Sequence, residues 1–142
     1  MFLSKNFTLE EFTSSQTASR LDLDNTPTPA VLDALTYTAQ KLEQVRALLG
    51  TPIIISSGYR SPKVNAAVKG AANSQHLLGE AVDFTSPAFG TPKQIVKKII
   101  TSGIEYDQVI QEYDSWVHIS FKKLAMRKQA LVIDKLGTRV FV

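Results

Sequence analysis

The sequence predicts an α+β fold in which helices pack against a small, largely antiparallel sheet. Three observations lead to this class. One long segment has apolar residues at helical spacing, several short segments are rich in β-branched residues, and two pairs of late strand segments are joined by turns short enough for hairpins. The 142 residues fit one domain, and we expect residues 1–142 to form it.

Two helices are expected in the first fifty residues. Thr8 and Glu11 have the spacing of a capping box, which predicts a short N-terminal helix. After a rigid, proline-containing turn at 25–29, apolar residues recur at helical spacing from Val31 onward, until Gly50 ends the pattern. This second segment is predicted to be the main helix of the core.

The rest of the chain is predicted to alternate short strands and short helices. Three consecutive isoleucines indicate a strand buried on both sides, because β-branched residues suit a pleated sheet. Thr91 and Pro92 have the N-cap and N1 chemistry of a helix start. The expected elements are a strand at 52–57, a helix at 63–69, a strand at 80–85, a helix from 92 to near 103, strands at 108–112 and 116–121, and a C-terminal hairpin at 130–133 and 138–142.

Composition restricts the partners and the chemistry. Without cysteine there is no disulfide framework and no thiolate metal site, so nitrogen and oxygen must hold any metal. The net charge of +3 is small and dispersed, and we expect a monomer with no nucleic-acid partner. No apolar run has the length of a signal-peptide core or a membrane span. We therefore expect cytoplasmic synthesis without membrane insertion, and release by another agent if the target lies beyond the inner membrane.

His76, Asp83 and His118 are the residues whose chemistry needs an explanation. A histidine beside a strand is commonly a buried side chain satisfied by hydrogen bonds. Asp83 lies between two apolar residues of a strand segment, where burial is costly unless the carboxylate is paired or binds a cation. Two imidazoles and one carboxylate suit a tetrahedral Zn²⁺ that keeps one position for water.

The motifs around these residues resemble those of a known family, the zinc D-alanyl-D-alanine carboxypeptidase-type peptidases. The pattern can be written SGYRSP…N…SxHxxGxAxD…WxH, and the resemblance, which includes a short, often phage-borne branch, runs from about Phe7 to about Phe121. The family shares its fold group with lysostaphin-type enzymes and the Sonic hedgehog signalling domain. The matching segments are Ser57 to Pro62, Asn65, Ser74 to Asp83, and Trp116 to His118.

The resemblance implies roles for individual residues. It makes His76, Asp83 and His118 the ligands of one zinc per chain. It also implies that Arg60 binds a substrate carboxylate or the oxyanion, which its fork of donors can meet with two hydrogen bonds. Further substrate contacts are expected from Ser74, Gln75 and Trp116, and Gly79 is expected to permit the tight turn between the first two ligands.

The general base is where the sequence departs from close relatives. They have a glutamate three residues before the last histidine, and this chain has Ser115 there. Other members of the fold group have the glutamate six residues before, which corresponds to Glu112. We therefore expect Glu112 to be the base, with Asp114 as the reserve candidate.

Two functions follow as hypotheses. The first is a zinc metallopeptidase that hydrolyses peptidoglycan stem-peptide bonds, as an endolysin-like endopeptidase or a D,D-carboxypeptidase. A phage or prophage lysis enzyme that reaches the cell wall after the membrane is opened would fit this hypothesis. The alternative is a non-catalytic, zinc-containing module for cell-wall binding or assembly, which the missing glutamate at the nearer position favours slightly.

Overall fold

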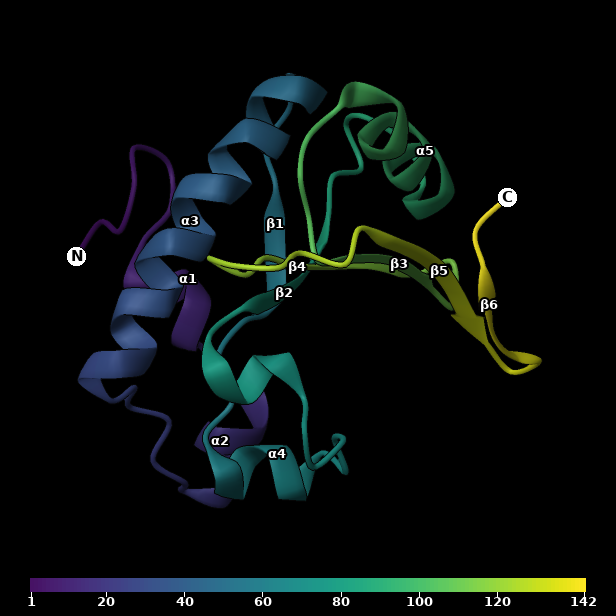
Figure 1. The fold of residues 1–142 in the computed structure, drawn as a ribbon. Coiled ribbons are helices and arrows are strands. Elements are labelled where there is room, and N and C mark those ends of the chain that lie inside the picture. Colours follow the sequence, from purple (N-terminus) through teal and green to yellow (C-terminus); the bar gives the residue numbers. More distant parts are fainter.

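A computed structural model describes residues 1–142, and a six-stranded sheet crosses its centre (Figure 1). Figure 1 shows helix α5 on one side of the sheet and the short helices η1 and α4 on the other. This arrangement confirms the predicted α+β class. The helices are α1 (Leu9–Thr13), α2 (Gln16–Leu21), α3 (Pro29–Leu49), α4 (Pro62–Ala67), the 3₁₀ helix η1 (Gln75–Leu78) and α5 (Pro92–Ser102). The strands are β1 (Ile54–Ser57), β2 (Ala81–Thr85), β3 (Gln108–Glu112), β4 (Trp116–Ser120), β5 (Gln129–Asp134) and β6 (Gly137–Val140).

The sheet is mostly antiparallel, as predicted, and has the order β1-β2-β4-β3-β5-β6. The one parallel pair is β3 with β5. It arises because β3 lies between β4 and β5. The loop after β4 crosses over β3, and β5 then pairs with the edge of β3 that faces away from β4. The C-terminal hairpin, β5 with β6, therefore extends the sheet beyond β3.

The predicted capping residues begin and end the helices. Thr8 and Glu11 form the capping box of α1, and Thr91 caps α5 with Pro92 in its first turn. Gly50 ends α3 in the left-handed conformation at φ 68°, which glycine adopts without steric cost.

One cluster of 20 buried residues forms the core between α3, α5 and one face of the sheet. On strands β2 and β4, Val82 and Ile119 point into this core, and they alternate with Asp83 and His118. The two polar residues therefore lie on the opposite face of the sheet. The sheet thus has one face that packs in the core and an opposite face that carries Asp83 and His118, which we call the functional face.

Several elements differ from the sequence prediction. Strand β1 lies at the edge of the sheet rather than between two strands, so Ile54 is 56% exposed and burial on both sides is wrong for this strand. Helices α2 and η1 were not predicted; Ser15 and Ser74 begin them with side-chain hydrogen bonds. None of the helices combines the length and apolar character that crossing a membrane requires.

Candidate metal centre and active site

Three side chains from different elements converge on one point: His76 from η1, Asp83 from β2 and His118 from β4. Their ligand atoms all lie within 4.8 Å of one another. Asp83 Oδ1 is 3.3 Å from His76 Nε2 and 2.9 Å from His118 Nδ1. The register of the β2–β4 pair brings Asp83 directly opposite His118, and η1 adds His76.

The surroundings of His76 fix which nitrogen is available. Its Nδ1 lies 2.7 Å from the carbonyl oxygen of Gly58, which can only accept a hydrogen bond. In the neutral ring Nδ1 therefore carries the proton, and Nε2 presents its lone pair toward Asp83. The Ser74 hydroxyl accepts a hydrogen bond from the His76 backbone amide. These contacts orient the imidazole before any ligand binds.

The chemistry of His76, Asp83 and His118 fits a zinc ion. Zinc binds nitrogen and oxygen at about 2.0–2.2 Å in tetrahedral geometry, so its ligand atoms lie about 3.3–3.6 Å apart. The 3.3 Å between Asp83 Oδ1 and His76 Nε2 agrees with this spacing, and the 2.9 Å to His118 is slightly shorter. Burial opposes the charge of Asp83, but the His118 and His76 rings beside it outweigh this effect and hold the pKa of the carboxyl well below its usual range. The group thus places an ionised carboxylate between two imidazole rings.

Glu112 lies at the edge of this centre. Its Oε1 is 3.8 Å from His118 Nδ1, and its side chain is 19% exposed. Burial and the charge of Asp83 raise the pKa of Glu112, although His118 and Arg60 counteract part of the effect. Asp114, in contrast, is exposed in the β3–β4 turn, where it accepts a hydrogen bond from Gln111. The geometry thus favours Glu112 over Asp114 for exchanging protons at the centre.

Arg60 and Trp116 border the same centre. Arg60 Nε and Trp116 Nε1 are buried and have no hydrogen-bond partner. Unpaired buried donors are costly, so a bound ligand that accepts hydrogen bonds from these two groups would be stabilised there. Burial lowers the pKa of the Arg60 guanidinium, while the charges of Asp83 and Glu112 act in the other direction. The Trp116 ring also packs 5.9 Å from the Tyr113 ring.

Gln75 lies in a hydrogen-bond network that the sequence analysis did not anticipate. Its amide nitrogen donates to Asp107 at 3.0 Å and to Glu80 at 3.2 Å. Asp107 is fully buried and also accepts three hydrogen bonds from Arg127. An acid at the start of an apolar strand was the available signal in the sequence. The network ties η1, next to His76, to the segment that leads into β5.

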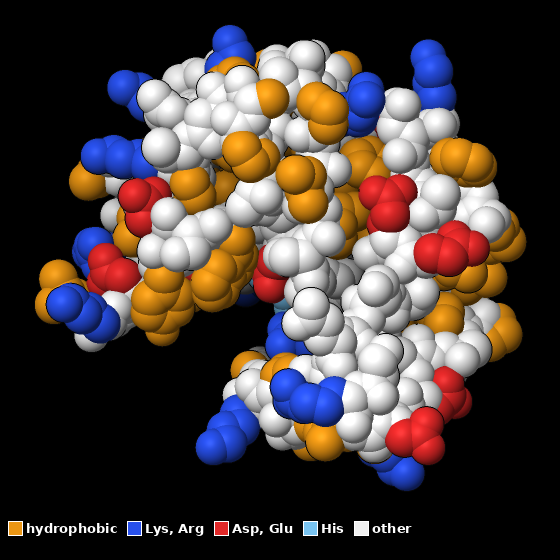
Figure 2. Space-filling model, turned by 180° about the vertical axis from the view of Figure 1, so that it is seen from behind, with side chains coloured by type: hydrophobic (Ala, Val, Ile, Leu, Met, Phe, Trp, Pro, Cys, Tyr) orange, Lys and Arg blue, Asp and Glu red, His pale blue; other side chains and the backbone are white.

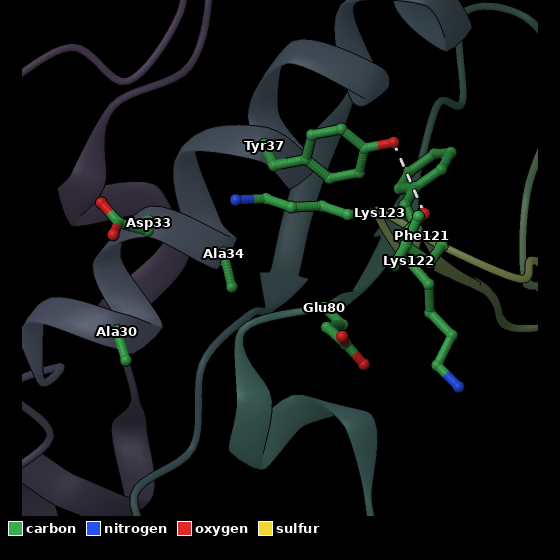
Figure 3. A pocket seen from close by; sticks show the side chains of 9 residues that line it. Ala30, Asp33, Ala34, Tyr37, Glu80, Phe121, Lys122 and Lys123 are labelled. Carbon is green, nitrogen blue, oxygen red and sulfur yellow. Dashed lines mark hydrogen bonds between the residues drawn. The ribbon is translucent and has the colours of Figure 1, made fainter.

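The candidate metal centre lies in a surface hollow. Figure 2 shows the molecule hollowed at one side, with acidic and histidine colours visible in the depth of the hollow. A surface pocket of about 440 Å³ lies elsewhere, between α3 and the segment after β4 (Figure 3). Figure 3 shows Tyr37, Glu80 and Lys122 around it, and none of the three converging residues lines it.

An α+β fold with a His–Asp–His group that could hold a metal ion is compatible with a metallopeptidase. Residues 5–120 match the model of the Peptidase M15 family, and the chain belongs to this family. A segment of 54 residues is 39% identical to the zinc D-Ala-D-Ala carboxypeptidase of Streptomyces albus G. That alignment covers 37% of this chain and 21% of the relative, so the chain matches about a fifth of the relative's length.

Proposed function

We propose that this chain is a zinc peptidase that hydrolyses peptide bonds in the stem peptides of peptidoglycan. The observation that carries the proposal is the convergence of His76, Asp83 and His118 beside the partly buried acid Glu112. Membership of the Peptidase M15 family supports the reaction class. The name of the Streptomyces albus G relative supports the substrate class, peptides that contain D-alanine.

The three converging residues would hold one zinc ion. When bound, zinc supplies Lewis acidity, which polarises an amide carbonyl and makes water a stronger acid. Glu112 takes a proton from the attacking water and later gives it to the nitrogen of the leaving amine, so that proton transfer balances over the reaction. The raised pKa of Glu112 suits both transfers, because it brings the carboxyl closer to neutral pH.

Arg60 is proposed to bind the developing oxyanion or a substrate carboxylate. Its unpaired, buried Nε is the contact that supports this role. Trp116 is proposed to line the substrate site, where a ligand acceptor would satisfy its indole N–H. Ser74 and Gln75 remain predicted substrate contacts, although their described hydrogen bonds are with the protein itself.

Digestion of purified peptidoglycan tests this function. We expect the protein to release soluble peptides or free D-alanine, to lose this activity with a zinc chelator, and to regain it when zinc is added back. Masses of the released fragments identify the bond, and they distinguish an endopeptidase from a D,D-carboxypeptidase. A role as a phage-type lysis enzyme stays a prediction, to be tested by lysis of cells with opened inner membranes.

The alternative is a zinc-containing binding or assembly module without activity. Ser115, at the position where close relatives have a glutamate, is the observation that favours it. The proximity of Glu112 to His118 weakens this argument, since a partly buried acid lies beside the centre. Binding to peptidoglycan without release of any fragment would establish the alternative.

A further inference from the structure

The C-terminal hairpin continues the functional face of the sheet. In the strand registers, Ile110 lies opposite His118 on β4 and beside Leu131 on β5. Glu112 lies beside Ile133 in the same parallel pair. Paired residues share one face of a sheet. Leu131 and Ile133 therefore face the same side as the metal centre.

This part of the functional face is apolar and open. Leu131 and Ile133 are only partly buried, and on β6 they pair with Val140, which is 68% exposed, and with Thr138. Figure 1 shows α5 on the opposite side of the sheet and no helix below the hairpin on the functional side. In Figure 2 the overhanging part that carries the hairpin shows hydrophobic side chains along its lower edge, next to the hollow. The cleft thus continues from the metal centre along an apolar wall.

The size of this wall fits a peptide. Four strands, from β4 to β6, span three inter-strand spacings of about 4.8 Å, or about 14 Å. An extended peptide advances about 3.3–3.6 Å per residue, so the wall has room for about four residues. A substrate that ended one residue beyond the cleaved bond would leave most of it uncovered.

We propose that Leu131 and Ile133 form an apolar subsite for the substrate peptide, which binds several residues on one side of the cleaved bond. This inference rests on the proposed peptidase function and deepens it, because it assigns the chain a longer peptide and cleavage at an internal bond. The occupant is a stretch of peptide with small apolar side chains such as alanine methyl groups. The hairpin lies beyond residue 120, where the family match ends, so the subsite belongs to this chain's own C-terminal segment.

Leu131→Thr and Ile133→Thr test the subsite, because each adds a polar hydroxyl to the apolar surface. Threonine is β-branched, a shape that strands prefer, so Ile133→Thr keeps this shape and Leu131→Thr introduces it. The matched control is Val132→Thr, which alternation places on the opposite face of β5. The substrates are a peptide with four residues on each side of the cleaved bond and a peptide with one. We expect each subsite variant to lower the ratio of kcat/KM for the long to the short peptide about five- to tenfold, mainly through KM. The ratio for Val132→Thr should equal that of the wild type.

Other outcomes overturn the subsite. An equal fall in the ratio for all three variants indicates general damage to the strand, and no fall in any of them indicates that the peptide binds elsewhere. A wild-type dimer in light scattering that Leu131→Thr dissociates shows that a second copy covers the hairpin.

A binding measurement separates this inference from the function. Isothermal titration of the long peptide into Glu112→Gln protein, with and without Leu131→Thr, does not depend on turnover. If the wild type hydrolyses neither peptide but Leu131→Thr still weakens binding, the subsite stands and the peptidase proposal fails. If hydrolysis depends on zinc but Leu131→Thr changes neither binding nor the ratio, the subsite alone fails.

Discussion

Oε1 of Glu112 lies 3.8 Å from Nδ1 of His118, on the adjacent strand of the β3–β4 hairpin. Glu112 pairs with Trp116, and His118 lies two residues after Trp116 on the same strand. The side chains of Glu112 and His118 therefore lie on the same face of the sheet. The three-residue turn between the strands explains why an acid six residues before His118 reaches it. Ser115, three residues before His118, lies in that turn and is exposed. The chain therefore has no acid at that position, but Glu112 lies beside the centre instead.

Changing Glu112 to glutamine tests its role in proton transfer. Glutamine keeps the shape and hydrogen-bonding capacity of the side chain but cannot accept the proton of the attacking water. We expect Glu112→Gln to remain folded, to keep its zinc, and to hydrolyse peptidoglycan about a hundredfold or more slowly. Initial rates of amine release, measured at equal zinc content, check the effect.

Asp114→Asn is the matched control for this variant. Asp114 is exposed, and its hydrogen bond to Gln111 lies outside the metal centre. We expect near wild-type turnover. Loss of turnover in Asp114→Asn together with normal turnover in Glu112→Gln would transfer the role of base to the acid in the turn.

The ion pair between the buried Asp107 and the exposed Arg127 predicts a pH-dependent stability. Burial opposes the charge of Asp107, but hydrogen bonds from Arg127 hold the pKa of the carboxyl at about 2. The unfolded value is about 3.9, so the folded-state pKa is depressed. The stabilisation is therefore complete above about pH 4 and is lost as the pH falls toward 2.

Urea unfolding of Asp107→Asn at two pH values measures this contribution. The guanidinium partner is 46% exposed and therefore partly screened, so we expect a pH-dependent part of about 1–2 kcal/mol. The difference in unfolding free energy between wild type and variant should be larger at pH 6 than at pH 2.5. Equal differences at the two pH values would show that the charge of Asp107 does not stabilise the fold.

Gly79 links His76 and Asp83, and a side chain there should disturb both. Its φ is +74°, and an added Cβ would lie 3.0 Å from the carbonyl oxygen of Val31 and 3.1 Å from Leu35 Cγ. We expect Gly79→Ala to lower the free energy of unfolding by about 2–3 kcal/mol and to weaken zinc binding. Urea denaturation and competitive zinc titration measure the two effects.

Gly103→Ala provides the comparison, because Gly103 has φ +83° but no atom within 4 Å of an added Cβ. Only the backbone cost of about 1 kcal/mol applies there, with no change in zinc affinity. An equal loss of unfolding free energy in the two alanine variants would show that the close contacts at Gly79 add no cost.

Local patterns predicted most of the elements. Capping residues such as Thr91 and helix-ending glycines such as Gly50 act through contacts within a few residues, so the sequence alone reveals them. The edge position of β1 and the parallel pairing of β5 depend on the order of strands in space. No short-range pattern encodes that order, and the exposure of Ile54 could not be foreseen.

Some of the functional residues could likewise be predicted from the sequence, and others could not. The cost of burying Asp83 on an apolar strand and the motif around it pointed to the converging group before its geometry was known. The network around Gln75 was not foreseen. Asp107, which accepts from Gln75, and Arg127, which donates to Asp107, lie 32 and 52 residues further along the chain. Their meeting depends on the crossing loop after β4.

Zinc content measured on purified protein tests the central claim most directly. Metal analysis of the wild type should give about one zinc per chain, and His76→Ala, Asp83→Ala and His118→Ala should each lower this value severely, because a three-ligand site cannot easily lose one donor. Lys69→Ala, an exposed change outside the centre, controls for handling. Circular dichroism should show that the variants remain folded. Full zinc occupancy in all three ligand variants would contradict the account.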